Sequence, residues 1–117
     1  MHFAGSVKPD QLAVLLSAAD IMVLASEREG LANAWVEALA CGTPLVITDA
    51  GGAREVVRDA SAGQIVERSA AGIVAGVQAV SADPPSQAEA AANAARFSWQ
   101  ANAEQLAAYY RCLAGKA

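Results

Sequence analysis

The sequence predicts an α/β protein with a parallel sheet and flanking helices. Short apolar runs alternate with stretches of helical pattern, which is typical of consecutive βαβ units. Two of the runs, residues 21–25 and 44–48, have the apolar character expected of strands covered on both faces. Gly42 and Pro44 end the helical stretch between them. The 117 residues are enough for one domain with one core.

The first half of the chain contains five predicted elements. A short strand over residues 2–7 precedes a helix over 9–19, which Pro9 opens. This helix carries Leu12, Leu15 and Leu16 on one face. A strand over 21–25, a helix over 31–41 and a strand over 44–48 follow.

The second half begins with a tight loop at residues 50–52 and becomes increasingly helical. We expect a short helix over 53–57, a brief strand over 64–67, and helices over 70–80, 84–96 and 98–113. Ser98 suits the N-cap of the last helix because its hydroxyl can accept a hydrogen bond from the first turn.

Composition and charge exclude several function classes. The net charge of −4 and the scattered basic residues argue against nucleic-acid binding. No apolar run approaches the ~18 residues of a membrane span. His2 is the only histidine, so no histidine-based metal site or catalytic triad lies within the chain. Two cysteines do not make a disulfide framework, and we therefore expect a reducing cytoplasm.

A candidate site follows the strand over 21–25. Ligands of open parallel sheets bind beyond the carboxyl ends of the strands. The loop that contains Glu29 and Gly30 lies there, and the next helix offers the N–H groups of Leu31, Ala32 and Asn33 to an anion such as phosphate. Gly30 allows the backbone to come close to that ligand.

Glu37 lies within the same helix, eight residues after Glu29. Its neighbours on the helix face are all small, while Leu31, Trp35 and Leu39 form a separate stripe directed at the sheet. A carboxylate in such a groove can accept hydrogen bonds from the two vicinal hydroxyls of a ribose. The spacing alone fits equally well a purely structural interpretation, in which Glu37 is an exposed helix residue and Glu29 an ordinary first-turn acid favoured by the helix dipole.

Residues 29–44 carry a glutamate, seven residues and a second glutamate, and they resemble the E-x7-E block of retaining glycosyltransferases of the family 4, or group 1, type. The similarity continues through residues 48–57, and weaker similarity is found at 3–7, 17–20 and 97–99. It implies a GT-B fold, with two Rossmann-like domains and the active site between them. The chain would then be an incomplete C-terminal, donor-binding domain over residues 1–117, lacking its first two strands and the whole N-terminal acceptor domain.

The resemblance also implies roles for individual residues. Glu29 would contact the transferred sugar near the reacting centre, and Glu37 would hold the ribose of a nucleoside-diphosphate sugar. Neither a cofactor nor a metal is expected. The remaining donor-binding residues implied are Gly30, Leu31, Ala32 and Asn33 at the helix start, and Gly5 and Val7 beside the base.

Two features limit what the chain is expected to do alone. The Arg/Lys pair with which the family neutralises the pyrophosphate lies upstream of Phe3, so we expect no turnover. The missing strands would leave the strand over 21–25 with an open edge, which could pair with a second copy or be covered by sliding of the strand over 2–7. A non-catalytic interaction module on the same scaffold is the alternative function. Peripheral membrane association of a full-length parent stays open.

Overall fold

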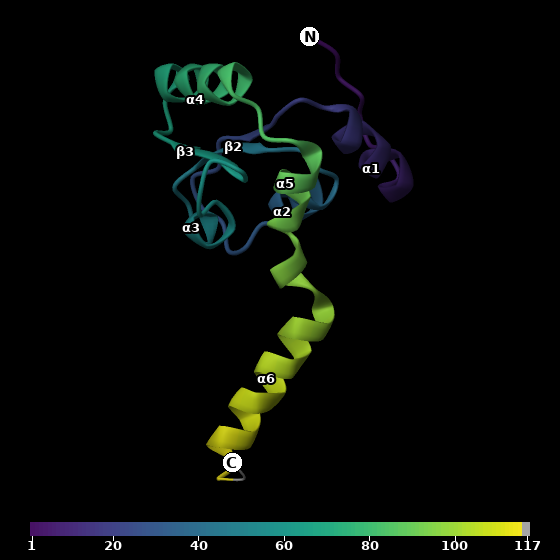
Figure 1. The fold of residues 1–117 in the computed structure, drawn as a ribbon, viewed down its shortest axis with the longest axis vertical. Coiled ribbons are helices and arrows are strands. Elements are labelled where there is room, and N and C mark those ends of the chain that lie inside the picture. Colours follow the sequence, from purple (N-terminus) through teal and green to yellow (C-terminus); the bar gives the residue numbers. More distant parts are fainter. Residues whose placement is uncertain (116–117) are drawn as a thin grey trace.

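The computed structural model describes residues 1–115 and contains a parallel three-stranded sheet. The strands lie in the order β1 (Met22–Leu24), β2 (Leu45–Thr48) and β3 (Gly63–Val66) (Figure 1). In the register Val23 pairs with Val46, and Val46 pairs with Gln64. The predicted α/β class with a parallel sheet is confirmed.

Helices cover both faces of the sheet. The helix α4 lies over one face, whereas α2 and α3 lie on the other (Figure 1). α5 and α1 pack mainly against α2. The helical elements are α1 (Pro9–Ala18), α2 (Asn33–Ala40), α3 (Ala53–Val56), α4 (Ala70–Ala82), α5 (Gln87–Ala92), the 3-10 helix η1 (Ala95–Phe97) and α6 (Trp99–Leu113).

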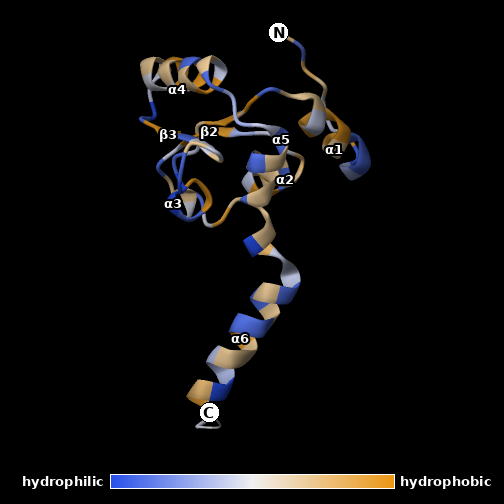
Figure 2. Ribbon diagram, viewed as in Figure 1, coloured by the Kyte–Doolittle hydropathy of each residue, from blue (hydrophilic) through white to orange (hydrophobic). Residues whose placement is uncertain are grey.

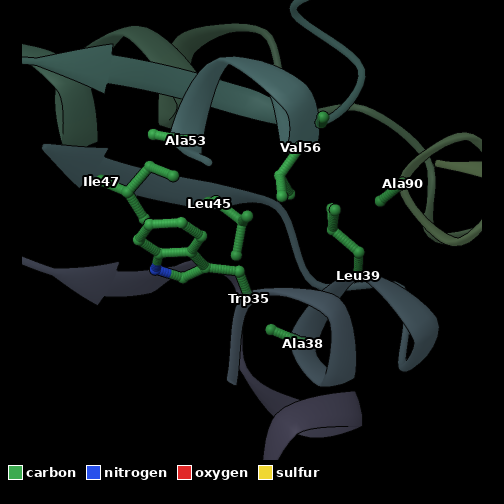
Figure 3. Packing of buried hydrophobic residues seen from close by; sticks show 9 residues of the cluster. Trp35, Ala38, Leu39, Leu45, Ile47, Ala53, Val56 and Ala90 are labelled. Atoms are coloured by element: carbon green, nitrogen blue, oxygen red, sulfur yellow. The ribbon is translucent and has the colours of Figure 1, made fainter. Parts of the chain in front are cut away.

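The core lies between β2, α2 and α3. Trp35 on α2 points its indole ring at Leu45 and Ile47 of β2, and Val56 of α3 closes the cluster (Figure 3). All four side chains are fully buried. Since much of the sequence is alanine, this single buried tryptophan supplies a large share of the core volume.

The last helix, α6, extends away from the rest of the domain (Figure 1). The Ser98 hydroxyl accepts a hydrogen bond from the N–H of Ala101 at 3.1 Å, which confirms its predicted capping role. None of the residues of this helix is buried, and hydrophilic and hydrophobic stretches alternate along it (Figure 2). The molecule is therefore elongated, at 54 × 31 × 26 Å.

The predicted strand over residues 2–7 is wrong, because those residues form no strand. A strand needs a neighbour for its N–H and C=O groups, and within residues 1–115 β1 pairs with β2 alone. Phe3 is 86% exposed, so no core contact holds the segment either. The predicted sliding of this strand onto the sheet does not occur, and the predicted open edge at β1 is present.

Two predicted helices differ in extent from the observed ones. The helix expected over 31–41 begins at Asn33, and the one expected over 84–96 is divided into α5 and η1. Pro85 disfavours a helical conformation at Pro84. Ser86 instead caps α5, because its hydroxyl accepts a hydrogen bond from the N–H of Glu89 at 3.3 Å.

Two residues assigned to the core lie at its margin. Trp35 and Leu39 are buried as predicted, but Leu31 is 43% exposed because it precedes α2. At the predicted end of its helix, the small side chain of Cys41 favours a core position, but the residue is half-buried. It borders a pocket between α1 and α2 instead.

Candidate functional site

Two loops meet at the carboxyl edge of the sheet. The loop after β1 contacts the glycine pair after β2, and the N–H of Gly52 donates to the carbonyl of Gly30 at 2.8 Å. Gly51 has a φ of +51°, and a Cβ there would lie 2.1 Å from the carbonyl oxygen of Glu29. Only glycine allows this close approach, so the double glycine fixes the position of the Glu29 loop.

The Glu29 carboxylate is held in place at this edge. The Ser26 hydroxyl donates to its Oε1 at 2.6 Å. The Ser26 carbonyl in turn accepts from the buried hydroxyl of Thr48 at the end of β2. These contacts connect Glu29 to the ends of two strands, which is the placement that the sequence predicted.

Glu37 is exposed on α2 and borders two pockets. The first, which we call the apolar pocket, lies between α1 and α2 and has a volume of about 400 Å³. The buried hydroxyl of Thr43 donates to the carbonyl of Leu16 and so fastens α1 beside α2. The apolar pocket is lined by Val7, Pro9, Leu12, Ala13, Leu16, Glu37, Ala40 and Cys41.

The second pocket lies on the other side of Glu37, where α2 faces the start of α6. It has a volume of about 230 Å³, and we call it the aromatic pocket. Phe97 is half-buried there, whereas Trp99 is 86% exposed. The aromatic pocket is lined by Leu31, Asn33, Val36, Glu37, Phe97, Trp99 and Asn102.

The structure brings some of the predicted donor-binding residues together. Glu37 shares one pocket with Val7 and the other with Leu31 and Asn33. Glu29 and Gly5 line neither of these pockets.

The start of α2 differs from the prediction. Ala32 is the N-cap of this helix and Leu31 lies in the loop before it. Of the three N–H groups predicted to bind an anion, only that of Asn33 therefore belongs to the first turn of the helix. The N–H groups of Leu31 and Ala32 belong to the loop that the double glycine positions.

Sequence reasoning missed the contribution from the start of α6. Phe97 and Trp99 carried part of the family resemblance without a predicted place in the site, and no pattern in the sequence indicated Asn102. Two of the chain's six aromatic residues flank one helix cap, which is a signal that could have identified this wall of the aromatic pocket.

Residues 1–115 contain no group of three or more His, Cys, Asp or Glu side chains arranged to hold a metal ion. In the same part of the chain no helix is long and apolar enough to cross a membrane.

Comparison with known proteins gives a family model and similar proteins that agree with one another. The family model described as glycosyl transferases group 1 matches residues 1–97. A D-inositol 3-phosphate glycosyltransferase from Geodermatophilus obscurus is 37% identical over 116 residues, which are 97% of this chain. A glycogen synthase from Mycobacterium tuberculosis is also 37% identical, over 93% of the chain.

Among solved structures, the chain is similar to a sucrose-phosphate synthase from Thermosynechococcus elongatus. The TM-score is 0.76, with 30% identity over 99% of this chain. The chain spans 26%, 28% and 31% of the lengths of these three relatives, so each of them is much longer.

Proposed function

The chain belongs to the group 1 glycosyltransferase family, and we propose that it is the donor-binding part of a retaining enzyme. Such an enzyme transfers a sugar from a nucleoside-diphosphate sugar to an acceptor hydroxyl. The observation that supports the proposal is the position of Glu37, which borders both the apolar and the aromatic pocket. A carboxylate at that position can bind the ribose of a nucleotide, which connects the base to the phosphates.

The apolar pocket suits the nucleoside. Apart from Glu37 its walls are almost entirely aliphatic, and its volume of about 400 Å³ falls in the range of small-molecule sites. With a base in this pocket beside Val7, the Glu37 carboxylate accepts hydrogen bonds from both ribose hydroxyls. Such charge-assisted bonds are stronger than neutral ones.

The diphosphate then lies toward the start of α2. The backbone N–H groups of Leu31, Ala32 and Asn33, together with the helix dipole, favour negative charge there. A Cβ added at Gly30 would meet no atom within 4 Å, so this part of the loop is open to a ligand. The fixed carboxylate of Glu29 contacts the transferred sugar near its reacting carbon.

The chain by itself is proposed to bind a donor without transferring its sugar. The chain spans 26% and 28% of the lengths of its curated relatives, so most of what those proteins contain is not part of the purified chain. A measurable rate of sugar transfer or donor hydrolysis by the purified chain would contradict this part of the proposal.

Titration of the isotope-labelled chain with UDP, GDP and ADP, followed by NMR, tests donor binding. We expect saturable shifts for at least one nucleotide, at residues around both Glu37 pockets. Glu37→Gln should weaken binding about 10-fold or more, because a charge-assisted hydrogen bond contributes about 1.5–3 kcal/mol. The matched control is Glu104→Gln, which removes an exposed carboxylate on α6 outside both pockets.

A second candidate function is a non-catalytic interaction module. It is favoured by the exposed apolar side chains on α6, which include Leu106, Tyr109 and Tyr110, and by the edge of β1 that no strand within residues 1–115 covers. Absence of saturable binding for all three nucleotides, with no effect of Glu37→Ala, would support the module and refute donor binding.

A further inference from the structure

Thr48 is a buried polar residue at the end of an apolar strand. The other three residues of β2 are apolar and fully buried, and Thr48 itself is only 2% exposed. A valine has nearly the same shape and carries no hydroxyl that must be paired, whereas an unpaired buried hydroxyl costs free energy. The Thr48 hydroxyl donates to an atom outside the strand, the backbone carbonyl of Ser26. Its purpose is therefore found in the loop that it contacts and not in the core.

This bond joins β2 to the chain after β1 where the paired backbone has ended. The register of the two strands stops at Leu24 and Ile47. Ser26 lies two residues beyond Leu24, so the side chain of Thr48 acts there in place of a backbone donor. Since β2 is the central strand of the sheet, the bond fixes the position of Ser26 relative to the core.

Ser26 passes this fixed position on to Glu29. Its hydroxyl donates to Oε1 of Glu29 at 2.6 Å, and both residues are half-buried. Gly51 separately approaches the backbone carbonyl of Glu29, so closely that a Cβ would lie 2.1 Å from it. The backbone of Glu29 is therefore held by the glycine pair, and its carboxylate is held by the connection from Thr48 through Ser26.

The group that holds the Glu29 carboxylate is neutral, which distinguishes this acid from two neighbours at the same edge of the sheet. Asp49 pairs with Arg54 at 2.6 Å, and Glu27 lies 3.7 Å from Arg68. Within residues 1–115 no basic side chain lies within 4.0 Å of the Glu29 carboxylate. A hydroxyl occupies one of the roughly four lone-pair sites of a carboxylate and leaves its negative charge in place. The other sites can accept hydrogen bonds from a sugar.

We propose that Thr48 is a positioning residue for the transfer reaction, acting through Ser26 on the carboxylate of Glu29. The inference rests on the proposed donor-binding function, in which Glu29 contacts the transferred sugar. With both bonds in place the carboxylate is already ordered, so little conformational entropy is lost when the sugar binds. Without the Thr48 hydroxyl the Ser26 carbonyl loses its partner and the carboxylate loses its fixed direction. Thr48 therefore supports binding of the sugar and not of the nucleotide.

NMR titration of the full chain with nucleotides and with sugar nucleotides tests this role. UDP, GDP and ADP are compared with UDP-glucose, GDP-mannose and ADP-glucose, and the ratio of the dissociation constants within each pair isolates the contribution of the sugar. Thr48→Val should weaken binding of the sugar nucleotide about 3- to 10-fold, the typical cost of ordering one side chain, and leave binding of the nucleotide unchanged. Thr48→Ser keeps the hydroxyl and should restore the wild-type ratio.

Thr43→Val is the matched control. Thr43 is also buried, and its hydroxyl also donates to a backbone carbonyl, that of Leu16 on α1. Because this bond fastens a wall of the apolar pocket, its loss should weaken binding of the nucleotide and of the sugar nucleotide by the same factor. Ser26→Ala leaves the buried strand intact and should change the ratio as Thr48→Val does. Combining these two substitutions should add nothing further, because both act on the same carboxylate.

A second measurement needs no ligand. Relaxation of the backbone amides should show increased motion of residues 26–30 in Thr48→Val and not in Thr43→Val. Unchanged motion of this loop, an unchanged ratio, or equal weakening of nucleotide and sugar nucleotide in Thr48→Val would overturn the proposal while donor binding stands. Absence of binding of every nucleotide to the wild type would refute donor binding itself, and the role of Thr48 with it.

Discussion

Replacing Gly63 by alanine tests the close packing of β3 against the backbone of β2. Gly63 begins β3, pairs with Leu45 of β2 and has a φ of +124°. A Cβ at this position would lie 1.9 Å from the carbonyl oxygen of Leu45 and 2.6 Å from its nitrogen. Neither atom can move aside alone, because both belong to the backbone of the central strand.

Two costs combine in the Gly63→Ala variant. An L-residue in this sparsely populated region of φ costs about 1–3 kcal/mol. Moving β3 away from β2 weakens backbone hydrogen bonds that contribute about 0.5–1.5 kcal/mol each, including the bond from Leu45 N–H to the Ala62 carbonyl at 2.9 Å. We expect a total loss of about 3–5 kcal/mol, a large part of the about 5–15 kcal/mol that stabilises a typical domain.

Urea unfolding followed by tryptophan fluorescence measures this loss. Trp35 is fully buried and Trp99 is 86% exposed, so the change in emission reports mainly on the core around Trp35. Gly30→Ala is the control: no atom lies within 4 Å of its added methyl and its φ is not positive, so a change within about 0.5 kcal/mol is expected. A Gly63→Ala variant as stable as this control would refute the reasoning.

Two further predictions concern other parts of the domain. Gly76→Ala should cost about 1–3 kcal/mol through overpacking, because its Cβ would lie 2.6 Å from Val66 Cγ1 and 2.8 Å from Val46 Cγ1; an unchanged urea midpoint would contradict the close packing of α4 on the sheet. Hydrogen bonds from the Ser86 hydroxyl and N–H hold the pKa of Glu89 below its ordinary value of 4.5. A lowered folded-state pKa gives stability that is present above the unfolded pKa and lost as the pH falls through the folded one. The urea midpoint of the wild type should therefore fall more steeply below pH 4.5 than that of Glu89→Gln, and parallel curves would argue against the capping box.

The elements that the sequence predicted correctly depend on local signals. Gly42 and Pro44 separate α2 from β2, and Ser98 caps α6 through its own first turn. The strand over residues 2–7 failed because a strand depends on a neighbour that is often distant in sequence. No apolar pattern within six residues contains that information.

For the candidate site too, the sequence indicated what local signals encode and missed what depends on distant residues. The spacing of Glu29 and Glu37 indicated a loop acid and a helix acid, and the structure has Glu29 in the loop after β1 and Glu37 within α2. That Glu37 borders two pockets could not be predicted, since their opposite walls come from α1 and from the start of α6. Another pocket, between the end of α3 and the start of α6, also joins residues far apart in sequence, Arg58 and Arg96.

The sequence by itself determined the α/β class, most of the helices and strands, and the helix that carries Glu37, because these follow from short-range periodicity, caps and breakers. The tertiary structure alone decided which elements face one another. It placed α1 beside α2, left one edge of β1 uncovered within residues 1–115 and brought Arg96 to the end of α3. Such contacts depend on the burial and hydrogen bonding of groups distant along the chain, and these are satisfied only once the whole chain has folded.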